Sequence, residues 1–282
     1  MSTTPRLLIG GLTLPEGPRW RDGQLWISDM FAGRILRLSL DGRTETVVET
    51  TGKVSGLGWL PDGRLLFVSM LDRRLLRLDA GGIVAAADLS TIASFHCNDM
   101  VVDRAGRAYI GNFGFDWMHG APFVGATLAL VDPDGTVRAA ARDLSYPNGM
   151  VITPDGRTLI VAESSADRVT AFDIAADGTL VNRRLWTTVD APDGICLDAE
   201  GAIWVASPRL AQVQRFLPGG EVTHRLSTPL APYACMLGGA DRRLLFICQA
   251  PKPEILLEAP PGTLRQGRVE YVEVAVPGAG LP

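Results

Sequence analysis

The sequence has little of what several large protein classes require. No apolar run approaches the roughly eighteen residues of a membrane-spanning helix, because stretches such as 65–70 end within the length of a strand. Its 27 Lys and Arg residues do not outnumber its 31 Asp and Glu residues, so no broad basic surface for nucleic acid is expected. Residues 1–11 lack a charged start followed by a long apolar segment, the pattern of a secretory signal. We therefore expect a cytoplasmic protein that binds neither membranes nor nucleic acid.

Cysteine pairs and amphipathic helix patterns are also scarce. The four cysteines form no C-x-x-C pair, which argues against structural zinc and against a disulfide framework, so buried free thiols are expected. Few stretches have the 3.6-residue period of a helix. By contrast, the chain has 31 glycines and 19 prolines. This composition indicates many short strands joined by turns.

An internal repeat organises the chain. In each of six segments an anchor residue is followed by a short apolar run, an Asp-Gly-like turn, a second apolar run and then a third. The anchors, 39 to 50 residues apart, are Glu16, Ser55, Asn98, Asn148, Asp193 and Cys235. This spacing is typical of a propeller blade with room for a fourth strand. We predict an all-β, six-bladed propeller as a single domain over residues 1–282, with residues 6–10 completing the last blade.

The anchors predict a metal site in the central channel. The first strand of each blade lines that channel, so residues at one repeat position should converge on the axis. Four anchors, Glu16, Asn98, Asn148 and Asp193, offer oxygen, and a hard cation would relieve the repulsion between the two carboxylates. The competing interpretation is that Asn148-Gly149 and Asp193-Gly194 are only turns. Glu16 favours the metal site, because Glu has no comparable preference for turns.

About fourteen positions after each anchor, a further residue closes an apolar strand, and we call these six residues the second ring. These residues could line the pocket, support the anchors, or be solvated strand ends. Asn112 and Glu163 are the better candidates for a site role, because each follows a strand from a blade with a polar anchor. The ring consists of Asp29, Met70, Asn112, Glu163, Ser207 and Gln249.

The segments EGPRW, NDMVVDRAGRAYIGN, PNGMVITPDGRTLIVAES and PDGICLDAEGAIWVA resemble the gluconolactonase, regucalcin and senescence-marker-protein family of six-bladed propellers. The resemblance covers nearly the whole chain. It implies one divalent metal ion bound by Glu16, Asn148 and Asp193, with Asn98 contacting metal or substrate. We expect Ca²⁺, with Zn²⁺, Mn²⁺, Mg²⁺ and Fe²⁺ as alternatives. The resemblance also implies hydrolysis of a lactone, with Asp193 as the general base.

One position departs from the sugar-lactone members, which carry Arg two residues before the Asn at position 98. Here His96 offers fewer donors than a guanidinium, yet it can titrate near neutrality. His96 is therefore either a substrate-binding and proton-transferring residue or a wall of the pocket. His119 and His224 are weaker candidates, and His224 is expected at the surface.

The third repeat contains an apolar insertion at residues 114–123. Trp117, Met118 and Phe123 are expected to cap the channel beside Phe95 and Tyr146, unless they pack against another blade or subunit. Phe95, His96, Asn98, Asn112 and Trp117 are thus our candidate substrate-binding residues.

The sequence predicts a metal-dependent hydrolase that opens a lactone or related cyclic ester. Asp193, Asn98 and His96 are the candidate catalytic residues, and the apolar insertion favours a substrate less polar than a sugar lactone. Two alternatives stay open. One is hydrolysis of another electrophile, such as a phosphoester-like or strained ether compound, and the other is a propeller that binds calcium without catalysis. The sequence does not indicate the oligomeric state.

Overall fold

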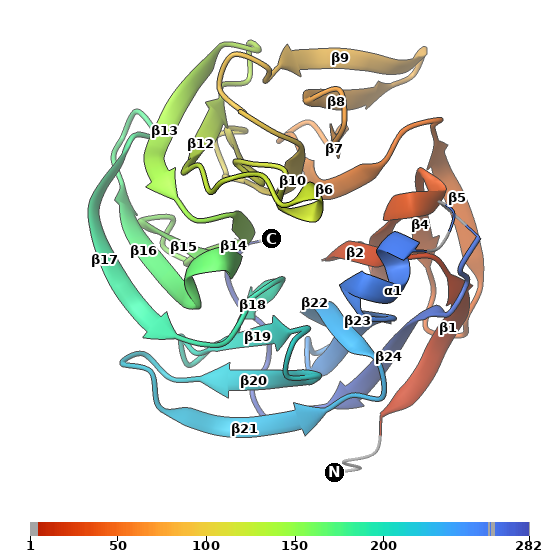
Figure 1. Cartoon of the computed structure of the whole chain (residues 1–282). Helices are drawn as coiled ribbons and strands as arrows, with labels where there is room; N and C mark the ends of the chain where they lie inside the picture. The colour runs from red at the N-terminus through yellow and green to blue at the C-terminus, as the bar shows by residue number, and fades with distance from the viewer. Residues whose placement is uncertain (1–4, 259, 261–262, 282) are drawn as a thin grey trace.

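The computed structural model describes residues 5–258, 260 and 263–281, and its strands form a ring around a central axis (Figure 1). The strands make six antiparallel sheets of four strands each, which confirms the predicted all-β, six-bladed propeller. Each sheet is one blade, and its first strand lies nearest the axis. No described helix is long and apolar enough to cross a membrane.

Five blades are continuous in sequence, with strands that follow one another from the axis outward. Blade 1 contains β2 (Pro15–Arg21), β3 (Gln24–Asp29), β4 (Arg34–Leu38) and β5 (Thr44–Glu49). Blade 2 contains β6 (Val54–Trp59), β7 (Leu65–Ser69), β8 (Arg74–Asp79) and β9 (Gly82–Asp88). Blade 3 contains β10 (Cys97–Val102), β11 (Ala108–Asn112), β12 (Ala126–Val131) and β13 (Val137–Leu144). Blade 4 contains β14 (Pro147–Ile152), β15 (Thr158–Glu163), β16 (Arg168–Ile174) and β17 (Leu180–Thr188). Blade 5 contains β18 (Ile195–Leu197), β19 (Ile203–Ser207), β20 (Gln212–Phe216) and β21 (Val222–Ser227).

The sixth blade joins the two ends of the chain. It combines β22 (Ala231–Gly238), β23 (Leu244–Ala250) and β24 (Gly267–Glu273) with β1 (Arg6–Leu12) as its outermost strand. Strand β1 pairs antiparallel with β24, with Arg6 opposite Tyr271 and Ile9 opposite Val269. The prediction that residues 6–10 complete the last blade is confirmed, and this pairing closes the ring.

The hydrophobic core lies between neighbouring blades. The largest fully buried side chains stand on second strands, and they are Trp204, Tyr109, Phe67 and Phe246. Each blade packs its alternating apolar residues against the next sheet, so the core is a set of connected interblade layers. The four cysteines are buried and free, as expected.

Close approach of the inner strands explains the glycines that follow the anchors. A Cβ atom added to Gly149 would lie 2.6 Å from the backbone oxygen of Asp193, and one added to Gly56 would lie 2.4 Å from the backbone nitrogen of Met100. Asn148 and Gly149 both lie inside strand β14, and the next blade leaves no room for a side chain at position 149. The alternative interpretation of this pair as a hairpin turn is wrong.

Short helical segments and the C-terminal segment lie at opposite ends of the inner strands. The segments η1 (Met30–Ala32), η2 (Trp117–His119), η3 (Ser164–Ala166) and α1 (Pro253–Glu258) connect the second and third strands of their blades, near the anchors. At the other end, Ile152 and Leu281 exchange backbone hydrogen bonds of 2.8 and 2.9 Å, and Ala279 donates to Leu197. The C-terminal segment thus ties blades 4 and 5 together on the face away from the anchors.

Candidate active site

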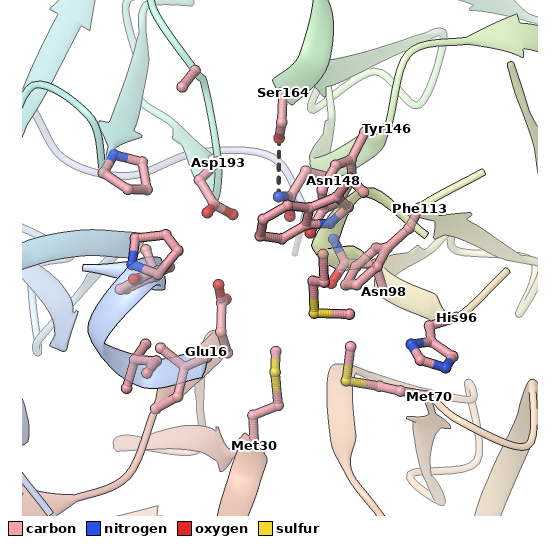
Figure 2. A pocket seen from close by; sticks show the side chains of 18 of the residues that line it. Glu16, Met30, Met70, His96, Asn98, Phe113, Tyr146, Asn148, Ser164 and Asp193 are labelled. Carbon is pink, nitrogen blue, oxygen red and sulfur yellow. Dashed lines mark hydrogen bonds between the residues drawn. The ribbon is translucent and has the colours of Figure 1, made fainter. Parts of the chain in front are cut away.

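A cavity of about 390 Å³ opens at the anchor end of the channel. Glu16 and Asp193 point toward each other across it from blades 1 and 5, and Asn148 and Asn98 lie beside them (Figure 2). The inner strands β2, β10 and β14 hold three of these residues, and Asp193 directly precedes β18. The structure therefore brings together the four residues that the repeat position selected.

The two facing carboxylates are electrostatically unfavourable in the absence of a cation. Burial, and then the charges of Asp193 and Asp99, raise the pKa of Glu16 well above its usual value. Burial and the charge of Asp99 raise the pKa of Asp193 in the same way. A positive ion between the two carboxylates would lower both pKa values.

Two polar atoms at this centre have unmet hydrogen-bonding capacity. Within the described part of the chain, Asn98 Nδ2 and Asp193 Oδ1 are buried without a hydrogen-bond partner. Unpaired buried polar atoms are costly and rare in native proteins, so both atoms are placed to meet a ligand.

Hydrogen bonds orient the other two side chains. Glu16 Oε2 accepts a hydrogen bond from the backbone nitrogen of Gly17 at 2.8 Å, which leaves Oε1 for a ligand. Asn148 Nδ2 donates to Ser164 Oγ at 3.1 Å (Figure 2). Ser164 Oγ in turn donates to the carbonyl of Pro192 at 2.6 Å. The amide oxygen of Asn148 is therefore the atom available to a ligand.

The donor set fits a divalent cation. The described residues contain no cluster of three or more His, Cys, Asp or Glu side chains that could hold a metal. The centre instead combines two carboxylates with carboxamide oxygens, which are ligands that hard cations accept. Residues Glu16, Asn148 and Asp193 could hold the ion, while the free Nδ2 of Asn98 suits a substrate oxygen better than a metal.

His96 lies at one side of the cavity, beyond Asn98 in Figure 2. Its ring stacks on Phe95 with centroids 4.0 Å apart and meets the edge of Phe113 at 6.0 Å. Burial and the nearby charge of Lys53 lower the pKa of His96, which favours the neutral form of the ring.

The remaining candidate residues divide between the cavity wall and the blade interior. Trp117, Met118 and Tyr146 line the cavity. Phe123 is 58% exposed and does not line it, and Phe95 supports His96 from behind. Outside the lining, Asn112 is fully buried, donates to the carbonyl of Thr127 and accepts from the backbone nitrogen of Gly114. Its amide thus holds the start of the insertion, and our placement of Asn112 against substrate does not match this geometry.

Most of the second ring binds the protein's own backbone. Asp29 accepts hydrogen bonds from the backbone nitrogens of Thr13 and Leu14, and Glu163 accepts one from Ser145. Ser207 donates to the carbonyl of Asp190. These side chains fix the segments that enter the inner strands, and of the ring only Met70 lines the cavity.

Comparison with known proteins identifies the family. Residues 14–251 match the SMP-30/Gluconolactonase/LRE-like region. The chain belongs to this family.

Named relatives of this family member include several lactonases. It is 26% identical to a pentonolactonase from Haloferax volcanii, over 88% of this chain and 85% of the relative. It is also 26% identical to a 6-deoxy-6-sulfogluconolactonase from Pseudomonas putida, over 95% of this chain and 94% of the relative. A crystal structure of regucalcin from Agrobacterium tumefaciens, described as a calcium-binding protein, superimposes with a TM-score of 0.82 at 23% identity. That alignment covers 99% of this chain and 96% of the other, and it shows the shared fold.

Some site residues of this family member were not predicted from its sequence. Arg19 and Asp99, whose charges act on Glu16, form a buried ion pair with a 2.7 Å contact, and the Arg19 side chain also donates to the carbonyl of Leu57. On the inner strand of blade 6 the residue that lines the cavity is Tyr233, whereas Cys235 lies 3.8 Å, sulfur to sulfur, from Cys196 between blades. Our choice of Cys235 as the sixth anchor is therefore wrong by two positions. The equivalent of Asn148 in blade 6 is Tyr233, because Pro232 pairs with Gln249 as Pro147 pairs with Glu163.

Proposed function

We propose that this chain is a divalent-metal-dependent hydrolase that opens a lactone or a related cyclic ester. Membership of the family and the names of its lactonase relatives support this assignment. The observation that carries it is the pair of buried, facing carboxylates with an unpaired Asp193 oxygen at the end of an open cavity.

The residues of the centre suit the successive steps of ester hydrolysis. Glu16, Asn148 and Asp193 would hold the metal ion, which supplies positive charge that polarises a carbonyl and acidifies water. Asp193 Oδ1 accepts the proton of the attacking water as the new C–O bond forms. The ester C–O bond of the ring then breaks, and Asp193 returns the proton to the departing ring oxygen. The product is a hydroxy acid, and its new carboxyl group releases the second proton of the water to solvent.

Asn98 and His96 would position the substrate. The free Nδ2 of Asn98 donates a hydrogen bond to a substrate oxygen, and that bond removes an unmet donor from the buried centre. In its neutral form, His96 can offer one donor or one acceptor to the substrate.

The cavity wall supports a substrate less polar than gluconolactone. Apolar side chains on several blades form most of the lining, and they include Met30, Phe31, Met70, Phe113, Trp117, Met118 and Leu256. A polyhydroxylated ring would leave many hydroxyl groups without partners against such a wall. The open cavity also favours catalysis over calcium binding alone, because a purely structural ion needs no space beside it.

A lactone panel tests this proposal. We expect the metal-loaded protein to hydrolyse an aromatic or aliphatic lactone with a higher kcat/KM than gluconolactone, and chelation to remove the activity. Asp193→Asn should abolish turnover and weaken metal binding, because the amide keeps the size but loses charge and basicity. Tm with and without metal monitors folding of the variant and binding of the ion. Full activity after verified metal removal, or wild-type rates in the variant, would contradict the mechanism.

A further inference from the structure

Lysine is rare among the basic residues of the chain, and most of them are arginine. Only two of the 27 are lysines, Lys53 and Lys252, and both line the cavity. Among the 25 arginines, Arg209 alone belongs to the lining.

These three cations differ in how their charge is balanced. Arg209 lies 2.9 Å from Asp190 and 3.5 Å from Asp167, and Lys252 is exposed to solvent. Lys53 is half-buried, and the described residues offer its ammonium group neither a hydrogen bond nor an ion pair. Its nearest recorded contact is the Phe31 ring, whose centroid lies 4.4 Å from Nζ.

An unpaired ammonium group in an apolar wall is unfavourable. Burial lowers the pKa of Lys53, because the apolar surroundings disfavour its charged form. A strongly hydrated ammonium normally stays in water on its flexible stem. Lys53 instead turns toward the cavity, where a negatively charged ligand would supply the missing partner.

The location of Lys53 separates it from the reaction centre. Its charge acts on His96, which lies across the cavity from Glu16 and Asp193 (Figure 2). The other charges that act on His96 are those of Asp116 and Arg73. The Asp116 carboxylate lies 2.7 Å from His119 Nδ1, and Arg73 donates to the carbonyl of Ala93. Of these groups only Lys53 lines the cavity, and the described residues give its ammonium no hydrogen bond or ion pair.

We propose that Lys53 determines specificity by pairing with a carboxylate on the substrate. The preferred substrate is then an anionic lactone or cyclic ester, with its reacting carbonyl near Asp193, an apolar body along the wall, and its carboxylate beside Lys53 and His96. This inference rests on the proposed function and adds a charge requirement at the far end of the same site.

The test compares one aromatic lactone in two forms, with a carboxylate or with a neutral carboxamide at the same ring position. We expect wild-type kcat/KM to be about tenfold higher for the carboxylate, the usual size of one charge-assisted contact. Lys53→Met keeps the length and apolar contacts of the side chain, so it should remove this preference by lowering kcat/KM for the carboxylate to the level of the carboxamide. Lys53→Arg should retain most of the preference. Lys252→Met, at the exposed lysine of the same cavity, is the matched control and should retain the preference for the carboxylate.

A binding measurement separates failure of this inference from failure of the proposed function. The corresponding lactams, which resist hydrolysis, are titrated calorimetrically into the metal-loaded wild type and Lys53→Met. About tenfold tighter binding of the carboxylate lactam to wild type alone supports the role of Lys53 even where no lactone is turned over. Equal affinity of wild type for both lactams, or no binding of either, overturns the inference even where lactones are hydrolysed. A preference that persists in Lys53→Met overturns it as well.

Discussion

Trp117 forms part of the cavity wall from η2, in the connection between β11 and β12. Its ring lies 6.4 Å from that of Tyr146, measured between centroids. Truncation to Ala would remove apolar surface that a bound ring can bury, at roughly 25 cal/mol for each Å². We expect Trp117→Ala to lower kcat/KM for an aromatic lactone by about tenfold, and for gluconolactone by less.

Phe123→Ala serves as the control for this residue, because Phe123 belongs to the same connection but does not line the cavity. Its rates should match those of wild type on both substrates. An equal loss in the two variants would mean that the connection acts through its fold, and unchanged rates in Trp117→Ala would show that the substrate does not reach this wall.

Single residues differ in how far the sequence could reveal them. Glu16, Asn148 and Asp193 were predictable, because a repeat places equivalent positions around one axis. The ion pair between Arg19 and Asp99 was not predictable, because the two residues are 80 positions apart. The equivalent repeat positions of the other blades carry no such charges. Lys53 gave no signal, since it precedes an anchor strand and belongs to no motif. Its importance depends on which groups surround it in three dimensions.

At the level of the strand, Glu163 stabilises blade 4 through buried hydrogen bonds to neighbouring segments. Its side chain ends β15, is fully buried, and accepts hydrogen bonds from Arg168, Thr170 and Ser145. Burial alone would raise the pKa of Glu163, but these hydrogen bonds outweigh it, and the pKa lies below its usual value. We expect Glu163→Gln to lower the free energy of unfolding by about 1–3 kcal/mol at pH 7.

The pH dependence of this loss distinguishes the charge of Glu163 from its packing. A carboxyl group with a lowered folded-state pKa stabilises the protein above its unfolded pKa of about 4.3, and this contribution fades as pH falls through the folded value. The difference in urea stability between wild type and Glu163→Gln should therefore shrink below about pH 4. A difference that stays constant down to pH 3 would assign the effect to packing alone.

Strands were easier to predict than the connections between them. Apolar runs bounded by Asp-Gly turns indicate strands directly, and the order of the strands follows from the repeat. The helix α1 was missed, although it brings Leu256 to the cavity wall. It spans only Pro253–Glu258, so it is too short for its periodicity to stand out.

For the whole molecule, closure of the ring depends on how firmly β1 docks on blade 6. Leu12 is 1% exposed in the layer shared by blades 5, 6 and 1, whereas Leu7 on the same strand is 61% exposed. We expect Leu12→Ala to lower the free energy of unfolding by about 2–5 kcal/mol, because it leaves a cavity in that layer. Leu7→Ala should change it by less than about 0.5 kcal/mol. Urea unfolding of both variants measures this contrast, and equal stability would show that β1 is not docked in solution.

The pairing of β1 with β24 also sets the order of events during synthesis. A chain leaves the ribosome N-terminus first, so β1 emerges before β24 and has to wait for it. Blades 1 to 5 can form their hairpins as they appear, but the open arc exposes unpaired strand edges and apolar layers until residues 267–273 are made. Glu16 and Asp193 likewise cannot share a closed cavity before that moment. The nascent chain is therefore prone to misassembly until β24 has been made and can pair with β1.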